Sequence, residues 1–194
     1  MERENKRVKR VLIVVDMVKG FRTVGNMAIK DIPHIDEEIK KLIEIFLNNG
    51  DDVIAIMEGH TNDSVEFNDF PEHCILGTSE AELIDILKPY QDRMICIRKN
   101  STSGFNTEGL QKYLKENAGR LKEIVFAGVC MDICVMNTVL PTKMYLNQNN
   151  IKCDVIVPLN ATETFDAPGH SREEYKDIAT KVLKLNGIKV PNRY

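Results

Sequence analysis

Hydrophobic and polar positions along this chain alternate between short strand-like runs and longer helix-like stretches. Five aliphatic residues at 11–15 are too few for a helix and predict a buried strand. Apolar residues recur at helical spacing from Ile35 to Phe46, and Gly50 marks the end of that helix. A second apolar run at 53–57 predicts the next strand.

The same alternation continues to the end of the chain. Ser79 and Glu82 have the spacing of a capping box and predict a helix over 83–87. Further strands are predicted at 94–97, 124–128 and 155–159, and a short final strand at 188–190. Helices are predicted around 110–114, after the fourth strand, and over 171–185. Pro141 falls within the helix after the fourth strand, so we expect that helix to break or bend there.

Strands that alternate with helices predict right-handed crossovers and a mostly parallel central sheet, with helices on both faces. The sequence contains no internal repeat, no low-complexity tract and no linker rich in Pro, Gly or Ser. We therefore expect one α/β domain over residues 1–194. In such sheets ligands bind beyond the carboxyl ends of the strands, which is where chemistry should be sought.

Composition narrows the class of protein. The 194 residues are 43% hydrophobic and 28% charged, which is typical of a soluble globular protein. A formal net charge of -3 argues against a nucleic-acid partner, and the short basic start around Lys6, Arg7, Lys9 and Arg10 is too mixed with acids to change that. No stretch has the length of a membrane span or the pattern of a signal peptide, so we expect a cytoplasmic protein without a membrane partner.

Three reactive side chains follow strand ends. Asp16 ends the first strand, Lys99 follows the third, and Cys134 enters the helix after the fourth. Each alone fits an ordinary structural role, but together they fit an activated nucleophile. The ammonium and a helix N-terminus would both favour the thiolate, while the carboxylate could accept the thiol proton. Cys130 is the competing thiol, but it lies in the turn after Gly128, so Cys134 is preferred.

The other cysteines have simpler interpretations. Five cysteines are an odd number, and an intracellular chain of this size is not expected to hold a disulfide framework. Cys96 and Cys153 lie in or beside predicted strands and are interpreted as core residues. Cys74, in a loop, is left open.

A second group of candidate residues follows the second strand. Glu58, His60 and His73 lie in one long segment, with Glu66 between them. Carboxylates and imidazoles are ligands of zinc, iron and manganese. The spacing alone fits a solvated surface loop equally well.

Several segments together resemble the isochorismatase-like cysteine hydrolases. They are Val14-Val15-Asp16-Met17-Val18-Lys19-Gly20-Phe21, Lys99 with Ser103-Gly104-Phe105, and Gly128-Val129-Cys130-Met131-Asp132-Ile133-Cys134-Val135. The segment Phe70-Pro71-Glu72-His73-Cys74, followed by Gly77-Thr78 and Ala81-Glu82-Leu83, is similar to the nicotinamidase (pyrazinamidase) branch. The resemblance runs from about Val11 to about Val157, and the motif that ends at Cys134 is its most specific part.

This resemblance implies a three-layer αβα fold of the Rossmann-like kind and a catalytic triad. The triad would be Asp16, Lys99 and Cys134. A cis peptide bond between Val129 and Cys130 would turn the Cys130 N–H toward the substrate, beside that of Cys134, as an oxyanion hole. Members of the family are often homo-oligomers, which we expect here as well.

The nicotinamidase branch further implies a divalent metal, zinc before iron or manganese. Its ligands would be Glu58, His60 and His73, with Glu66 as a further ligand. Phe21 and Phe70 would flank the substrate ring. Three residues depart from the family pattern: Glu58 replaces an Asp, Phe70 replaces a Trp, and Asn160 stands where an Asp often follows the fifth strand. The nucleophilic cysteine argues against isochorismatase activity itself.

The expected function is hydrolysis of nicotinamide, or a close analogue, through a thioester on Cys134. The first alternative is the same chemistry without a metal on an N-carbamoyl or ureido compound. The second is a non-catalytic binding protein or thiol sensor in which Cys130 and Cys134 form a redox pair. That sensor would leave Asp16 and Lys99 without a role.

Overall fold

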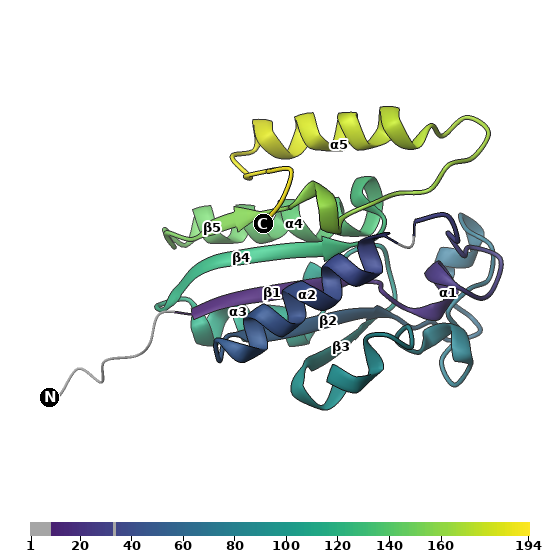
Figure 1. Ribbon diagram of the computed structural model, residues 1–194, viewed down its shortest axis with the longest axis horizontal. Coiled ribbons are helices and arrows are strands. Elements are labelled where there is room, and N and C mark those ends of the chain that lie inside the picture. The colour runs from purple at the N-terminus through teal and green to yellow at the C-terminus, as the bar shows by residue number, and fades with distance from the viewer. Residues whose placement is uncertain (1–8, 33) are drawn as a thin grey trace, which may run out of the picture.

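The computed structural model describes residues 9–32 and 34–194 (Figure 1). Five strands form one all-parallel sheet in the order β3-β2-β1-β4-β5. They are β1 (Lys9–Val15), β2 (Asp52–Glu58), β3 (Ile95–Lys99), β4 (Leu121–Gly128) and β5 (Asp154–Ile156). The helices are α1 (Lys19–Arg22), α2 (His34–Asn48), α3 (Glu108–Asn117), α4 (Met136–Gln148) and α5 (Arg172–Leu185). A π-helical turn (Met131–Val135) precedes α4, and short 3-10 helices lie at Val65–Asn68, Ser79–Ala81, Lys88–Arg93, Gly104–Asn106 and Leu159–Ala161.

The sheet is the middle of three layers, as the alternation of strands and helices predicts. Side chains of β1 alternate between its faces, so Leu12 and Val14 pack with Ile39 and Phe46 of α2. Val11, Ile13 and Val15 belong to the second core, with apolar side chains of α3, α4 and α5. Figure 1 shows α2 in front of the sheet and α3 and α4 behind it. The predicted three-layer αβα class is confirmed.

The predicted final strand at 188–190 is reduced to a single bridge. Lys189 pairs in parallel with Ile156 at the free edge of β5. Its N–H donates to the carbonyl of Val155, and its carbonyl accepts from Val157, both at 2.9 Å. Regular pairing does not continue because Pro191 has no N–H to donate, although its carbonyl accepts from the Leu159 N–H at 2.9 Å.

The predicted helix over 83–87 is wrong. Residues 79–81 form only a 3-10 turn, and the backbone beyond it pairs with the segment after β1. The Lys19 N–H donates to the Glu82 carbonyl at 2.8 Å, and the Ile84 N–H donates to Met17 at 3.1 Å. These tertiary hydrogen bonds take the place of a helix that would begin at residue 83. Glu82 is not a capping residue, because its carboxylate pairs with the ammonium of Lys19 at 3.3 Å.

Cys96 is a second correction. It is exposed rather than buried, because β3 is an edge strand that points this side chain to solvent. Cys153 is partly buried against the second core, directly before β5. Cys74 is fully buried.

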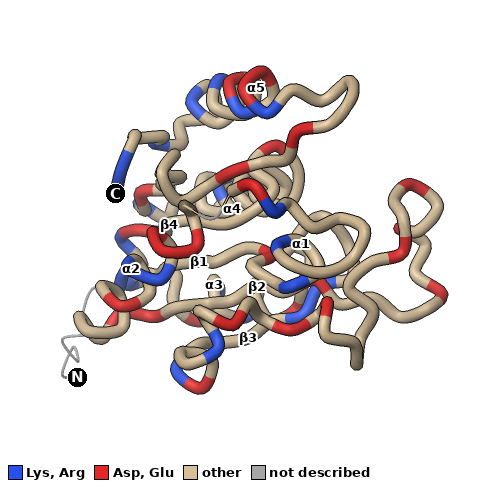
Figure 2. Tube along the Cα trace, turned by 45° about the vertical axis from the view of Figure 1, so that its right-hand side comes forward, with Lys and Arg blue, Asp and Glu red and all other residues tan. Residues whose placement is uncertain are grey.

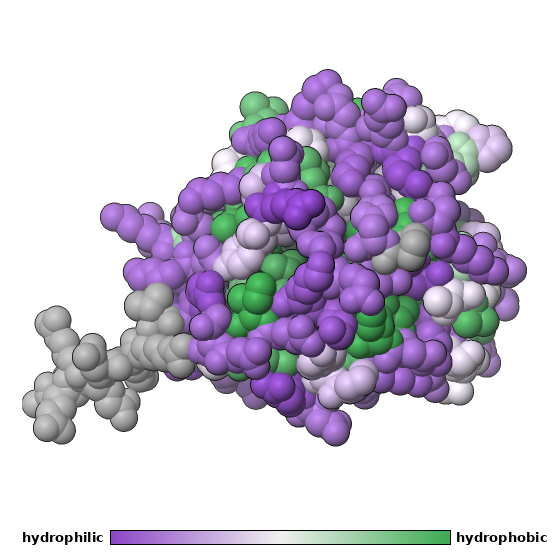
Figure 3. Space-filling view, in the orientation of Figure 1, coloured by the Kyte–Doolittle hydropathy of each residue, from purple (hydrophilic) through white to green (hydrophobic). Residues whose placement is uncertain are grey.

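The surface carries both signs of charge. Figure 2 shows basic and acidic residues interspersed along α2 and α5, and the face in Figure 3 is mostly hydrophilic with small, separated hydrophobic areas. Among the described residues, no helix is long and apolar enough to cross a membrane. Lys6 and Arg7 of the basic start lie outside the described residues.

Candidate active site

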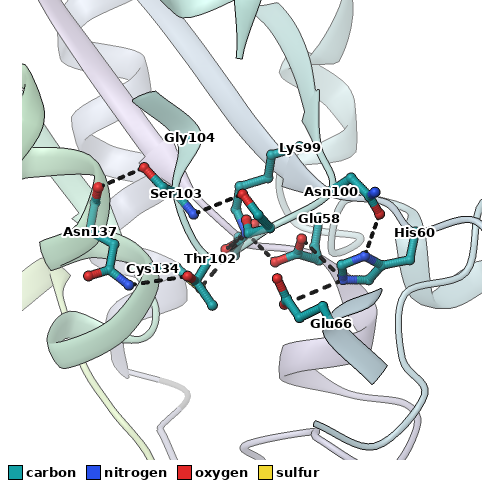
Figure 4. A network of polar contacts seen from close by, with 12 residues as sticks. Glu58, His60, Glu66, Lys99, Asn100, Thr102, Ser103, Gly104, Cys134 and Asn137 are labelled. Atoms are coloured by element: carbon teal, nitrogen blue, oxygen red, sulfur yellow. Dashed lines mark hydrogen bonds and ion pairs between the residues drawn. The ribbon is translucent and has the colours of Figure 1, made fainter. Parts of the chain in front are cut away.

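The carboxyl ends of β1, β3 and β4, which lie at the same edge of the sheet, bring Asp16, Lys99 and Cys134 together. Asp16 directly follows β1, with a positive φ of 53° and an N–H that donates to the Ile56 carbonyl at 2.9 Å. Lys99 is the last residue of β3, and its Nζ lies 2.9 Å from Asp16 Oδ2. Cys134 lies in the π-helical turn after β4, with its Sγ 3.8 Å from the same Nζ (Figure 4). An acid, a cation and a thiol thus meet at one buried point.

Burial and neighbouring charges together set the pKa values of these groups. Burial opposes the charge of Lys99, but Asp16, Cys134 and Glu58 together hold its pKa well above the ordinary value. Burial, followed by the charge of Asp16, raises the pKa of Glu58. The Cys134 thiol also has its pKa raised by burial, and Lys99 only partly opposes this. The expected resting thiolate is therefore not favoured, and Cys134 needs a base to remove its proton.

The turn between β4 and the π-helical segment sets the position of both candidate cysteines. Gly128 has a φ of +119°, and a Cβ there would lie 2.0 Å from the Val15 carbonyl oxygen, so only glycine fits. The bond between Val129 and Cys130 is cis. Cys130 and Cys134 line the same cavity. Burial raises the pKa of Cys130 to about 12, so its thiol keeps its proton.

Helix α4 continues through Pro141, so the expected break is wrong, while a bend at this proline stays a prediction. A proline at 141 cannot donate to the carbonyl of Asn137 four residues earlier. The Ser103 hydroxyl donates to that carbonyl instead, at 2.8 Å (Figure 4). One turn earlier, the Thr138 hydroxyl donates to the Cys134 carbonyl at 2.7 Å. Reasoning from the sequence missed these supports, although Pro141 itself signals a carbonyl that needs another donor.

Two histidines turn the same ring nitrogen toward a common point. The Nδ1 atom of His60 lies 2.7 Å from Asn100 Oδ1, and the Nδ1 atom of His73 lies 2.7 Å from the Pro71 carbonyl. Each Nδ1 can donate to its oxygen, which leaves a lone pair on each Nε2. The two Nε2 atoms are 3.2 Å apart. Two nitrogens on a tetrahedral zinc ion would be about 3.3 Å apart.

Carboxylates complete this cluster. Glu58 Oε1 lies 3.2 Å from His60 Nε2, and Glu66 Oε1 lies 3.7 Å from it. One ligand atom from each of Glu58, His60, Glu66 and His73 falls within 4.8 Å of all the others. Among the described residues, no donor is hydrogen-bonded to the buried Glu58 Oε1. Facing lone pairs and an unpaired carboxylate oxygen fit a divalent cation.

Glu58, Glu66 and His73 of this cluster line one cavity of about 380 Å³ together with Cys134. Phe21, Phe70, His73 and Cys134 are among the residues that line it. The Phe21 ring is 5.3 Å from that of His73. This volume suits a small molecule. The two phenylalanines place aromatic surface beside the thiol and the cluster.

A three-layer parallel sheet with this site at its carboxyl edge defines the class of protein. The chain belongs to the isochorismatase family, and the isochorismatase domain matches residues 10–186. Like its homologues, it is a hydrolase that acts on non-peptide carbon–nitrogen bonds of amides.

The chain is similar in sequence and structure to several known amide hydrolases. The chain is 34% identical to nicotinamidase 1 of Arabidopsis thaliana over 182 residues, which cover 85% of this chain and 73% of that protein. It resembles the crystal structure of nicotinamidase PncA from Bacillus subtilis with a TM-score of 0.80 and 27% identity, covering 95% and 99% of the two chains. The N-carbamoylsarcosine amidase of Thermoplasma acidophilum matches with a TM-score of 0.76 and 27% identity, covering 95% and 96%.

Proposed function

We propose that this protein hydrolyses nicotinamide, or a close aromatic amide, to the carboxylic acid and ammonia through a thioester on Cys134. The observation that carries the proposal is the shared cavity. Cys134, which lies beside the buried Asp16–Lys99 pair, lines this cavity together with Glu58, Glu66 and His73 of the four-residue cluster that includes His60. The nicotinamidase relatives of the chain agree with this choice of substrate.

The first half of the reaction forms the thioester. Asp16 takes the proton of the Cys134 thiol, and the sulfur attacks the amide carbonyl carbon to give a tetrahedral oxyanion. The N–H groups of Cys130 and Cys134 hold that oxyanion. When it collapses, the carbon–nitrogen bond breaks, Asp16 returns its proton to the nitrogen, and ammonia leaves. Lys99, whose Nζ lies 2.9 Å from Asp16 Oδ2, holds Asp16 in place throughout.

The second half releases the acid. Water attacks the thioester carbonyl carbon while Asp16 accepts one of its protons. The carbon–sulfur bond then breaks, the carboxylic acid leaves, and the proton returns to Cys134. Buried Asp16 is suited to both halves because it lies beside Cys134. One carboxylate oxygen of Asp16 and one of Glu58 lie within 4.8 Å of the Cys134 sulfur.

A divalent metal fits the second side of the cavity. Glu58, His60 and His73 would hold it, with Glu66 as a further ligand, and zinc suits this donor set better than iron or manganese. When bound, it supplies a Lewis acid that orients a ring nitrogen of the substrate. Phe21 and Phe70 flank the substrate ring. With the ring in this position, the amide group of the substrate lies next to the Cys134 sulfur.

A second candidate is hydrolysis of an N-carbamoyl or ureido compound without a metal. Lys30 lines the cavity and would suit a substrate carboxylate. The N-carbamoylsarcosine amidase matches this chain at the same 27% identity as the nicotinamidase structure. A non-catalytic thiol sensor explains less, because it gives no role to the buried Asp16–Lys99 pair.

The test is ammonia release from nicotinamide by the wild-type protein and by Cys134→Ala. We expect the variant to lose at least about 10³-fold in kcat, as when a catalytic nucleophile is removed. Cys96→Ala, an exposed cysteine on the edge strand, is the matched control and keeps the wild-type rate. Full turnover by Cys134→Ala would overturn the proposal. Ammonia release only from N-carbamoyl compounds would select the second candidate.

A further inference from the structure

The segment between β5 and α5 forms one wall of the cavity. It passes over the carboxyl ends of the strands (Figure 1) and contributes Phe165, which lines the cavity together with Cys134. Its backbone is joined to the turn after β4, because the Glu163 N–H donates to the Gly128 carbonyl at 3.2 Å. The Met131 N–H in turn donates to the Glu163 carbonyl at 2.9 Å. The wall and the cysteine turn are therefore directly connected.

Beyond Phe165 the segment has little packing of its own, since residues 166–169 are exposed. Arg172 holds the backbone before residues 166–169 and connects the segment to Asp31, in the loop before α2. Its Nε donates to the Thr164 carbonyl at 2.9 Å, and its Nη2 lies 2.7 Å from Asp31. These contacts hold the main chain but not the Phe165 ring. The ring needs a support on the side away from the cavity.

His170 supplies that support. Its ring stacks on Phe165, with centroids 3.8 Å apart and planes 7° from parallel, and Tyr175 stacks on the opposite face at 3.8 Å. Its Nε2 lies 2.7 Å from Asp132 Oδ2, and its Nδ1 lies 3.2 Å from the Phe165 carbonyl. The second oxygen of Asp132 accepts from the Thr164 hydroxyl. His170 is thus held by an aromatic sandwich and by a residue of the cysteine turn.

We propose that His170 is a positioning residue that holds Phe165 as the aromatic wall of the substrate cavity. The inference rests on the proposed amide hydrolysis at Cys134. His170 itself does not line the cavity, so it acts through Phe165. Because Asp132 lies between Cys130 and Cys134 in the sequence, this contact aligns the wall with the nucleophile. Loss of His170 should weaken binding of a flat substrate ring more than it slows the chemistry.

The experiment is a double-mutant cycle between His170→Phe and Phe165→Leu, read as KM and kcat for nicotinamide. His170→Phe keeps a flat ring between its neighbours but loses both hydrogen bonds. We expect its KM to rise about tenfold, which is the factor for one lost hydrogen bond to a charged group. Its kcat should change less than about twofold. In the Phe165→Leu background the same change should leave KM unaltered, because the two residues act as one unit. Met144→Phe, at an exposed side chain on α4, is the control for a surface substitution to phenylalanine and keeps the wild-type KM.

Other outcomes overturn the inference. An unchanged KM in His170→Phe, or KM effects that simply multiply in the double variant, would reduce His170 to a structural residue. If His170→Phe does not fold, His170→Gln replaces it, since that side chain keeps an N–H toward Asp132, and the same cycle applies.

The inference and the proposed function can fail separately. Calorimetric binding of nicotinamide to Cys134→Ala, with and without His170→Phe, measures the wall without turnover. A tenfold weaker Kd supports the inference even if the wild-type protein releases no ammonia. An equal Kd overturns it even if Cys134→Ala proves inactive.

Discussion

Lys99 is the residue on which the electrostatics of the site depend. Its side chain is fully buried and faces two buried carboxylates, Asp16 at 2.9 Å and Glu58. Its Nζ also donates to the Ser101 carbonyl at 2.9 Å. Removing one partner of a buried ion pair leaves an uncompensated charge, which costs far more than the pair itself contributes. Lys99 is therefore needed both for the charge of Asp16 and for the folded state.

Replacing this cation should be strongly destabilising. We expect Lys99→Met to lower the free energy of unfolding by about 3–5 kcal/mol, because Asp16 and Glu58 are then buried without a counter-charge. Urea unfolding of the metal-free protein measures the change. Lys181→Met, at a side chain that is 73% exposed, is the control and should stay within about 0.5 kcal/mol of wild type. Adding Asp16→Asn to Lys99→Met should restore part of the loss. A wild-type value for Lys99→Met would contradict this account.

At the residue scale, the sequence was informative wherever a side chain directly follows a strand. Asp16, Lys99 and Cys134 could be placed together because parallel strands end at one edge of a sheet. The protonation state of Cys134 could not be predicted, since it depends on how completely the thiol is buried. His170 was missed because its stacking partners, Phe165 and Tyr175, have meaning only once the segment has folded back.

At the scale of elements, α4 shows how a helix accommodates an internal proline. Pro141 removes the N–H that would pair with the Asn137 carbonyl, and Ser103 donates to that carbonyl from the segment after β3. The hydrogen bond joins the helix after Cys134 to the segment that follows Lys99. The nucleophile and the cation are therefore held in register by a side chain that the proline makes necessary.

This interpretation predicts coupling between two positions. Ser103→Ala should cost about 1 kcal/mol of unfolding free energy, because the Asn137 carbonyl loses its donor. In a Pro141→Ala background residue 141 regains its N–H, so Ser103→Ala should then cost close to nothing. Urea unfolding of both single variants and the double variant gives the coupling energy. Thr107→Ala, which removes a helix cap on α3, is a control that should cost the same in both backgrounds. Additive Ser103 and Pro141 effects would show that the two positions are independent.

Elements were predicted well where the apolar pattern was long and poorly where tertiary pairing decided the outcome. The long helices α2 and α5 and the four longer strands follow their apolar patterns. Residues 83–87 carry apolar residues at helical spacing, yet their backbone pairs with Met17 and Lys19. Cys96 belongs to a real strand, but the sequence could not show that this strand lies at the edge. In each case the missing information was the identity of the neighbour.

At the scale of the whole molecule, one edge of the sheet gathers segments far apart in the chain around a single cavity. Glu58 ends β2, His60, Glu66 and His73 come from the loop after it, and Cys134 arrives from the other half of the sheet. Binding of a metal by Glu58, His60, Glu66 and His73 should therefore stabilise the loop after β2 and its attachment to that strand. The homo-oligomeric state and the cytoplasmic location stay predictions from the sequence.

The cluster of Glu58, His60, Glu66 and His73 predicts that zinc raises the thermal stability of the folded protein. A ligand present at 100 times its Kd stabilises the folded state by about 2.7 kcal/mol. For a chain of this size that raises Tm by roughly 5–10 °C. Thermal unfolding of chelator-treated protein, with and without added zinc, measures the shift, and iron and manganese are compared in the same way. The reason to expect it is structural, since within residues 9–32 and 34–194 the facing Nε2 atoms of His60 and His73 contact only each other and the carboxylates among polar groups.

Variants decide whether the shift arises at this cluster. His60→Ala removes the central imidazole and should abolish the zinc-dependent rise in Tm, whereas His34→Ala, at a side chain that is 58% exposed, should keep it in full. Chelation should then stop ammonia release from nicotinamide by the wild-type protein. An equal rise in His60→Ala would place the metal elsewhere. The absence of a rise with all three cations, together with turnover that survives chelation, would leave the proposed chemistry of Cys134 intact and favour the metal-free hydrolysis of N-carbamoyl compounds.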